Sequence, residues 1–136
     1  MTFGFSRQAD YRAENLICNG METTFDVSNN GEVLGSVMIG MPGRHNVQNA
    51  MAAISATLEL DVSFEVVKEA LHQFTGVERR FSVRGSCGSA LIVDDYGHHP
   101  VEIVATLTGA AASFPDKKIV AVFQPHRFTR VRDLMS

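Results

Sequence analysis

The spacing of apolar positions changes along the chain, and each spacing predicts a different kind of element. Before residue 43, alternating apolar and polar positions are interrupted by two Asn-Gly dipeptides, which favour the tight turns of β-hairpins. This part of the chain is therefore expected to form short strands over residues 11–18, 23–27 and 32–39.

From Asn46 onward, apolar residues recur every three to four positions, as they do on the buried face of a helix. A first helix is expected to bury Val47, Ala50, Met51, Ile54 and Leu58. Ser63 is typical of a helix N-cap. The helix that follows it is expected to bury Val66, Val67, Ala70, Leu71 and Phe74.

After Gly76, short apolar runs alternate with one helical segment, a pattern typical of βαβ units. Strands are expected over residues 81–84, 89–93 and 118–123. The helix between the last two strands is expected to bury Ile103, Leu107, Ala110 and Phe114. The predicted fold class is therefore α/β, with a junction between two parts near residues 76–80.

Composition places the chain among ordinary globular proteins. It has 136 residues, of which 45% are hydrophobic and 20% are charged. The net charge of −3 gives no indication of a nucleic-acid partner or an anionic membrane. Cys18 and Cys87 lack the spacing of a disulfide framework, and the sequence shows no targeting segment, so a cytoplasmic location is expected.

The arginines are unevenly distributed, with one group at residues 79–84 and another at residues 127–132. Local positive charge on a mildly acidic protein suggests a small anionic ligand. The simpler interpretation of Arg79 and Arg80 is a solvated turn, with Phe81 docked into the core.

Two polar clusters follow apolar runs that are expected to be strands. Asp94-Asp95-Tyr96-Gly97-His98-His99 follows residues 90–93, and Gln124-Pro125-His126-Arg127-Phe128-Thr129-Arg130 follows residues 119–123. In open α/β sheets, ligands bind beyond the carboxyl ends of the strands. If the two strands are parallel neighbours, both clusters open onto one cleft.

The first cluster also has simpler interpretations. Asp94 and Asp95 could stabilise the start of the next helix through its dipole, and His98 and His99 could be surface residues. A metal site that also includes His126 is a further alternative, although adjacent histidines point in different directions.

Asparagines and arginines elsewhere allow two interpretations each. Asn46 and Asn49 lie three positions apart near the start of a helix, where their amides could contact an adenine edge, but Asn46 could merely cap that helix. Arg127 and Arg130 could clamp a carboxylate or a phosphate, or could form a solvated face.

Four motifs follow one another: Gly43-Arg44-His45-Asn46-x-x-Asn49, Gly76-Val77-x-Arg79-Arg80-Phe81, Asp94-Asp95-Tyr96-Gly97-His98-His99-Pro100-x-Glu102 and Phe123-Gln124-Pro125-His126-Arg127-Phe128-x-Arg130. Their order and spacing resemble those of the Mur ligase family of cell-wall synthesis. The resemblance covers essentially the whole chain, although the chain would cover only part of such an enzyme. It implies that residues 1–77 are the C-terminal part of the central ATP-binding domain. Residues 78–136 would then begin the Rossmann-like C-terminal ligase domain.

The activity that this resemblance implies is ATP-dependent formation of an amide bond in peptidoglycan synthesis. The carboxylate of UDP-N-acetylmuramate would become an acyl phosphate, which the amine of L-alanine would then attack. A family member that recycles muropeptides by attaching a tripeptide is one alternative, since it shares the Asp-Asp-aromatic-x-His-His-Pro element. A non-enzymatic module that binds a nucleotide or a metal is another.

The resemblance also implies roles for individual residues. The nucleotide would be contacted by His45, Asn46, Asn49, Arg80 and Asp95. The substrate side would be lined by Tyr96, His98, His126, Arg127 and Arg130. Among these, catalysis would depend on His98, Arg127 and Arg130.

The sequence contains no phosphate loop of the form G-x-x-x-x-G-K-[ST]. ATP and Mg²⁺ are thus expected to bind the complete enzyme, with the magnesium ligands mostly outside this chain and no metal ligand assigned within it. Because the central domain would be incomplete, self-association that covers its helix faces is also an expectation.

The chain alone is expected to show no ligase or ATPase turnover. Phosphoryl transfer depends on electrostatic stabilisation by magnesium and by the lysine of a phosphate loop. This sequence has no phosphate loop. Phosphate release is measured after incubation with Mg-ATP, UDP-N-acetylmuramate and L-alanine. Release that survives repurification and disappears in Arg127→Ala would contradict the prediction.

Overall fold

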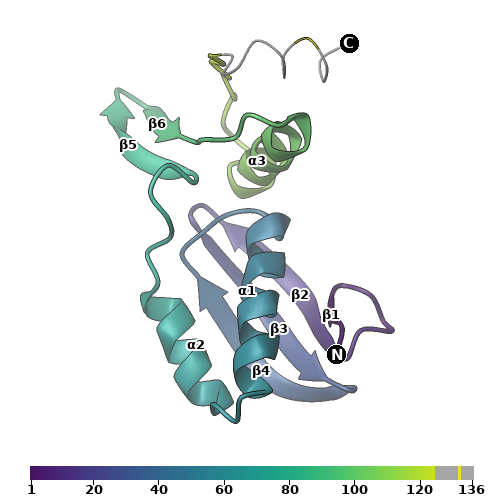
Figure 1. Ribbon diagram of the computed structural model, residues 1–136. Helices are drawn as coiled ribbons and strands as arrows, with labels where there is room; N and C mark the ends of the chain where they lie inside the picture. The colour runs from purple at the N-terminus through teal and green to yellow at the C-terminus, as the bar shows by residue number, and fades with distance from the viewer. Residues whose placement is uncertain (125–131, 133–136) are drawn as a thin grey trace.

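The computed structural model describes residues 1–124 and residue 132. Its first part is a four-stranded sheet with the order β1-β2-β3-β4, as Figure 1 shows. The strands are β1 (Phe3–Gly4), β2 (Tyr11–Asn19), β3 (Glu22–Asn29) and β4 (Glu32–Ile39). β1 runs parallel to β2, and the other neighbours are antiparallel. The three strands expected from the alternating pattern are confirmed, with Gly20 and Gly31 at positive φ in the two turns.

Two helices, α1 (Arg44–Leu58) and α2 (Phe64–Gln73), cover one face of this sheet (Figure 1). The predicted face of α1 is confirmed, with Leu58 partly buried at its end. Burial of these side chains from water is the main force that holds sheet and helices together. The core consists of Tyr11, Ala13, Phe25, Val27, Val37, Ile39, Val47, Ala50, Met51, Ile54 and Val67.

The second helix is only partly covered. Ser63 is its N-cap and Val67 is buried, as expected, but Val66 is 59% exposed and Phe74 is 43% exposed. Ala70 is exposed as well, so the prediction of a fully buried face was wrong. The reason is a groove of about 390 Å³ between α1 and α2, which no other described element fills.

The second part contains a hairpin and a helix in place of the expected βαβ units. β5 (Ser82–Cys87) pairs antiparallel with β6 (Ala90–Asp94). Gly88 lies in the two-residue turn between them with φ of 59°, a conformation that glycine adopts without strain. A short turn of this kind can join only antiparallel strands, because parallel strands need a long crossover.

The prediction of a strand over residues 118–123 was wrong. Residues 118–124 pair with no strand, and Val120 and Val122 are 75% and 94% exposed. A strand is stabilised by its ladder of hydrogen bonds with a neighbour, and here the apolar run has none. The apolar face expected for helix α3 (Pro100–Ser113) is accordingly only half-buried at Ile103, Leu107, Ala110 and Phe114.

Helix α3 is docked on the first part through its smallest residues. Gly109 is buried against Gly43, so closely that a Cβ on Gly109 would lie 3.0 Å from the Cα of Gly43. One turn further on, the carbonyl of Ser113 accepts a hydrogen bond of 3.1 Å from Gly20 N, in the turn between β2 and β3. These contacts bring α3 to the N-terminal end of α1 (Figure 1). No helix among the described residues is long and apolar enough to cross a membrane.

Substituting Gly109→Ala should weaken this docking. The added methyl forces the backbone of α3 away from Gly43, and overpacking of this kind costs roughly 1–3 kcal/mol. Alanine is the better helix former by about 1 kcal/mol, so α3 itself should remain helical. Hydrogen exchange of the Gly20 amide, which Ser113 protects only in the docked arrangement, should become faster.

The matched control is Val104→Ala on the same helix, where the side chain is 63% exposed. It should leave the exchange of the Gly20 amide unchanged. Equal exchange rates for the Gly20 amide in the wild type and in Gly109→Ala would show that the glycine contact does not hold α3 in place.

Candidate functional site

The loop between β6 and α3 is organised by the carboxylate of Asp95. One oxygen accepts a hydrogen bond of 2.9 Å from Phe81 N, and the other accepts one of 2.6 Å from Gly97 N. A Cβ on Gly97 would lie only 2.7 Å from that second oxygen, so any other residue at this position would displace the Asp95 carboxylate. Asp95 therefore joins the end of β6 to the segment that precedes β5.

That preceding segment has a strained backbone. Arg79 and Phe81 have φ of 60° and 51°, in the left-handed region that residues with a Cβ rarely adopt. The carbonyl of Arg79 accepts a hydrogen bond of 2.7 Å from Tyr96 N, and the Phe81 side chain is buried. Docking of Phe81 was predicted correctly. The solvated turn was also predicted correctly, because residues 78–80 form an exposed turn. The hydrogen bond from Tyr96 N holds this turn where Arg80 lies close to Glu102, at the start of α3.

The start of α3 is held by a capping box. The Nδ1 atom of His99 accepts a hydrogen bond of 3.3 Å from Val101 N, and the carboxylate of Glu102 accepts one of 3.1 Å from His99 N. The interpretation of Asp94 and Asp95 as helix caps was therefore wrong. Each carboxylate has partners in the segment before β6, and His99 takes the capping position instead.

Glu102 is a site residue to which the sequence interpretation gave no role. Its Oε2 atom also accepts a hydrogen bond of 3.1 Å from His98 N, and its Oε1 atom lies 3.5 Å from Nη1 of Arg80. The hydrogen bonds from the His98 and His99 amides and the charge of Arg80 hold the Glu102 pKa below its ordinary value. A glutamate three residues after a helix cap is the spacing that could have revealed it.

Aromatic and basic side chains stack beside this loop. The rings of Tyr96 and His98 meet edge to face at 5.0 Å, and the guanidinium of Arg79 lies 5.0 Å from the Tyr96 ring. Nδ1 of His98 lies 2.9 Å from the Tyr96 carbonyl. Because a carbonyl oxygen can only accept, Nδ1 carries the proton in this contact. His98 and His99 thus have different orientations and different tautomers.

The outer carboxylate, Asp94, belongs to the hairpin. It lies 3.1 Å from Nη2 of Arg84 and 3.5 Å from Nε of Arg79. Pairs that are this exposed contribute little stability. Of the two adjacent aspartates, only Asp95 is directed into the loop that faces α1.

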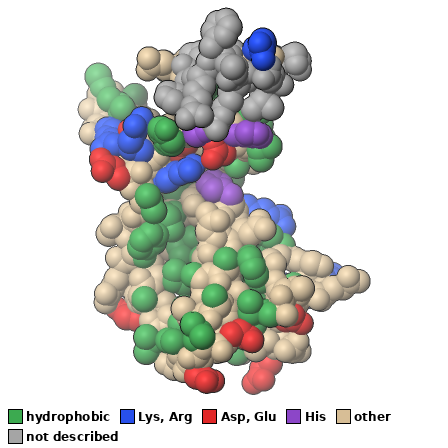
Figure 2. Space-filling view, viewed as in Figure 1, with side chains coloured by type: hydrophobic (Ala, Val, Ile, Leu, Met, Phe, Trp, Pro, Cys, Tyr) green, Lys and Arg blue, Asp and Glu red, His purple; other side chains and the backbone are tan. Residues whose placement is uncertain are grey.

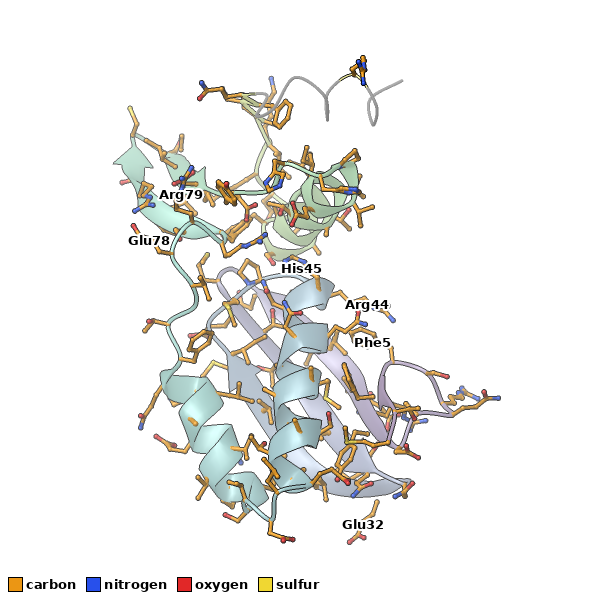
Figure 3. All side chains as sticks on the ribbon, in the orientation of Figure 1. Phe5, Glu32, Arg44, His45, Glu78 and Arg79 are labelled. Carbon is orange, nitrogen blue, oxygen red and sulfur yellow. The ribbon has the colours of Figure 1, made fainter. Side chains whose placement is uncertain are left out.

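His45, in the first turn of α1, faces this loop from the other part of the molecule (Figure 3). Partial burial lowers the pKa of its ring, the nearby Asp95 carboxylate opposes that shift, and the charge of Arg80 adds to it. Asp95 and Arg80 both lie in the second part of the chain. The docking of α3 therefore brings three of the sequence-predicted residues together.

Asn46 does not cap α1, because the N-cap is Gly43 and no side chain caps the helix. The amide of Asn46 instead donates a hydrogen bond of 2.7 Å to the carbonyl of Pro42. Asn49 lies one turn further along α1 and is exposed. The first turn of α1, which no side chain caps, and the positive end of its dipole lie in the same region as His45.

Figure 2 shows histidine, basic and acidic side chains gathered where the two parts of the molecule meet. His45, Arg80, Asp95, His98 and Glu102 belong to this region, which we call the junction site. Tyr96 lies at its edge. The predicted site residues His126, Arg127 and Arg130 lie outside the described residues.

The metal alternative gains no support from the described part of the chain. Within residues 1–124 and at residue 132, no three His, Cys, Asp or Glu side chains are grouped so that they could hold a metal ion. His126, which that alternative also requires, is not among them.

Comparison with known families identifies the class of protein. A sequence model of the Mur ligase middle domain matches residues 1–57, and one of the Mur ligase glutamate ligase domain matches residues 79–136. The chain belongs to the Mur ligase family.

Individual relatives are more specific. A UDP-N-acetylmuramate–L-alanine ligase of Salinibacter ruber is 50% identical over 135 residues, which cover 99% of this chain and 28% of that protein. The corresponding ligase of Pelobacter propionicus is 50% identical over 134 residues, 98% of this chain and 29% of that protein. The chain thus spans less than a third of the length of each relative.

Solved structures of related ligases are also similar to this chain. The UDP-N-acetylmuramate-alanine ligase of Thermotoga maritima superposes with a TM-score of 0.84 at 36% identity, over 96% of this chain and 31% of that one. A murein peptide ligase of Psychrobacter arcticus superposes with a TM-score of 0.56 at 33% identity, over 93% of this chain and 26% of that one. Both similarities extend across the junction between the two parts.

The pKa of His45 should respond in opposite directions to its two charged neighbours. Arg80→Gln removes a positive charge and should raise it, whereas Asp95→Asn removes a negative charge and should lower it further. Because burial holds this pKa below the unfolded value, the stability that His45 contributes is lost as the pH falls below about 6.5. Ring titration by NMR measures the shifts directly.

Arg84→Gln is the control, because Arg84 pairs with Asp94 on the hairpin and is not among the groups that shift His45. If neither Arg80→Gln nor Asp95→Asn moved the His45 titration, the two parts of the chain would not meet at the junction site in solution.

Proposed function

We propose that the chain is part of an ATP-dependent ligase that joins L-alanine to UDP-N-acetylmuramate in peptidoglycan synthesis. The 50% identity to two ligases named for this reaction supports the choice within the family. The observation that carries the proposal is the meeting of His45, on α1, with Arg80 and Asp95 from the second part. In this proposal, residues 1–77 end the central domain and residues 78–136 begin the C-terminal domain.

The nucleotide would be held by His45, Asn46, Asn49, Arg80 and Asp95. The residues fit an ATP molecule in part. The guanidinium of Arg80 and the uncapped start of α1 suit phosphate oxygens, and the amide of Asn49 is exposed for contact with a base. Asn46 has its amide nitrogen engaged with Pro42, so its oxygen is the atom left to contact an adenine amino group.

The substrate side would be formed by Tyr96, His98, His126, Arg127 and Arg130. When bound, ATP supplies the phosphoryl group that activates the muramate carboxylate, and Mg²⁺ neutralises its phosphates. Arg127 and Arg130 would bind the carboxylate and the charge that builds up in the transition state. His98, whose Nδ1 lies 2.9 Å from the Tyr96 carbonyl, would contribute its ring to this side of the site.

A tripeptide-attaching ligase is the second candidate, because the murein peptide ligase of Psychrobacter arcticus shares this fold at 33% identity. The identity of 50% to two alanine ligases, against 33% to the murein peptide ligase, favours L-alanine as the amine substrate. Both candidates use the same junction site, so they differ only in the amine that is joined.

A segment exchange tests the proposal. This chain replaces the matching segment of the Thermotoga maritima ligase, and phosphate release is measured with Mg-ATP, UDP-N-acetylmuramate and L-alanine. We expect turnover that requires all three substrates and that falls at least tenfold in Arg80→Ala, about 1.4 kcal/mol. A second exchange into the Psychrobacter arcticus ligase, assayed with its tripeptide substrate, is the comparison.

A folded exchange protein without activity in the alanine ligase would contradict the proposal. Activity only in the peptide ligase would favour the tripeptide alternative. Lys68→Ala, on α2 and remote from the junction site, is the control and should retain full activity.

A further inference from the structure

Glu102 uses its two carboxylate oxygens for different purposes. Oε2 accepts hydrogen bonds from the His98 and His99 amides, each at 3.1 Å, and so holds the loop at the start of α3. Oε1 lies 3.5 Å from Nη1 of Arg80, which comes from the segment before β5. One side chain therefore connects both segments that contribute to the junction site.

Helix capping alone does not account for this arrangement. The His99 side chain already accepts a hydrogen bond from Val101 N at the same helix start. The bond from His98 N lies outside the capping box, and the contact with Arg80 adds nothing to the helix. Arg80 is flanked by two residues in strained conformations, Arg79 and Phe81, and such conformations persist only where the surroundings enforce them.

The electrostatic surroundings of Glu102 are those of a carboxylate that remains ionised. Arg80 faces it from the segment before β5, and Nδ1 of His98 lies 3.9 Å from its Oε2. The hydrogen bonds from the two amides and the charge of Arg80 lower the pKa of Glu102. A permanent negative charge beside Arg80 restricts the guanidinium to one side, the side of α3.

We propose that Glu102 is the positioning residue of the junction site. It fixes the Arg80 guanidinium and the backbone of His98 in the arrangement that receives the nucleotide phosphates. This inference rests on the proposed function for the identity of the ligand, but not for the geometry. Glu102 itself does not touch the substrate.

Glu102→Gln separates positioning from capping. The amide oxygen of glutamine still accepts the bonds from His98 N and His99 N, so α3 keeps its start. Its NH₂ group, however, brings donors toward a guanidinium that also only donates. Arg80 thereby loses its partner while the helix is retained.

The first measurement uses the 136-residue chain and does not depend on its function. In the wild type, NMR signals of the His98 and His99 amides and of Arg80 Nε should shift together as Glu102 is protonated, with one common midpoint below the ordinary range of a glutamate. In Glu102→Gln this common transition should be absent. Separate midpoints for Arg80 and the two amides in the wild type would overturn the proposal.

The second measurement uses the exchange protein described above. Glu102→Gln should raise the KM for ATP roughly fivefold, the upper end of what an exposed ion pair contributes, with a smaller change in kcat. Glu65→Gln is the matched control, because Glu65 also lies in the first turn of a helix and pairs with Lys68 at 3.8 Å, remote from the junction site. It should leave the KM for ATP unchanged.

The two measurements distinguish the two ideas. An inactive wild-type exchange protein would contradict the proposed function, while the common NMR transition would still support the positioning of Arg80. An active exchange protein whose KM for ATP is unaffected by Glu102→Gln would overturn the positioning role. A loss of the α3 signals in the variant would also overturn it, because Glu102 would then act through the fold of the helix.

Discussion

The close approach of Gly109 to Gly43 is the contact on which the junction site depends. His45 lies two residues after Gly43 on α1. Arg80 and Asp95 lie in the segments on either side of the β5–β6 hairpin, and Glu102 lies on α3. Without a close approach of the two backbones, these groups would belong to separate surfaces. The two glycines thus determine where the charged residues of the junction site lie, although glycine has no side chain that could bind a ligand.

Much of the first part follows from local sequence. The Asn-Gly turns give the antiparallel strands, and the spacing of three and four gives the buried face of α1. The second part was predicted less accurately. An apolar run indicates a strand but does not specify which strand it pairs with, or whether the pairing is parallel or antiparallel. Residues 90–94 paired with β5 as a hairpin, and residues 118–124 paired with no strand.

The structure adds the connections between residues that the sequence could only propose for a site. Asp95, Arg80 and His45 were identified from motif order, yet their proximity arises from tertiary docking, which spacing does not encode. Histidine is an unusual helix cap, so the assignment of that position to the aspartates was the more ordinary expectation and was wrong. The capping role of Glu102 could have been predicted from its position three residues after the helix cap. Its contact with Arg80 could be seen only in the structure.

The glycine contact also has an evolutionary consequence. A side chain at either position would push the two parts of the chain apart, because a Cβ on Gly109 meets Gly43 and a Cβ on Gly43 meets both the His45 ring and Gly109. Neither site can therefore drift alone, even though each lies in a different part of the chain. Substitutions at positions 43 and 109 should therefore be correlated among homologues. A protein that combines the first part of one distant homologue with the second part of another should fold correctly only when both positions carry a small residue.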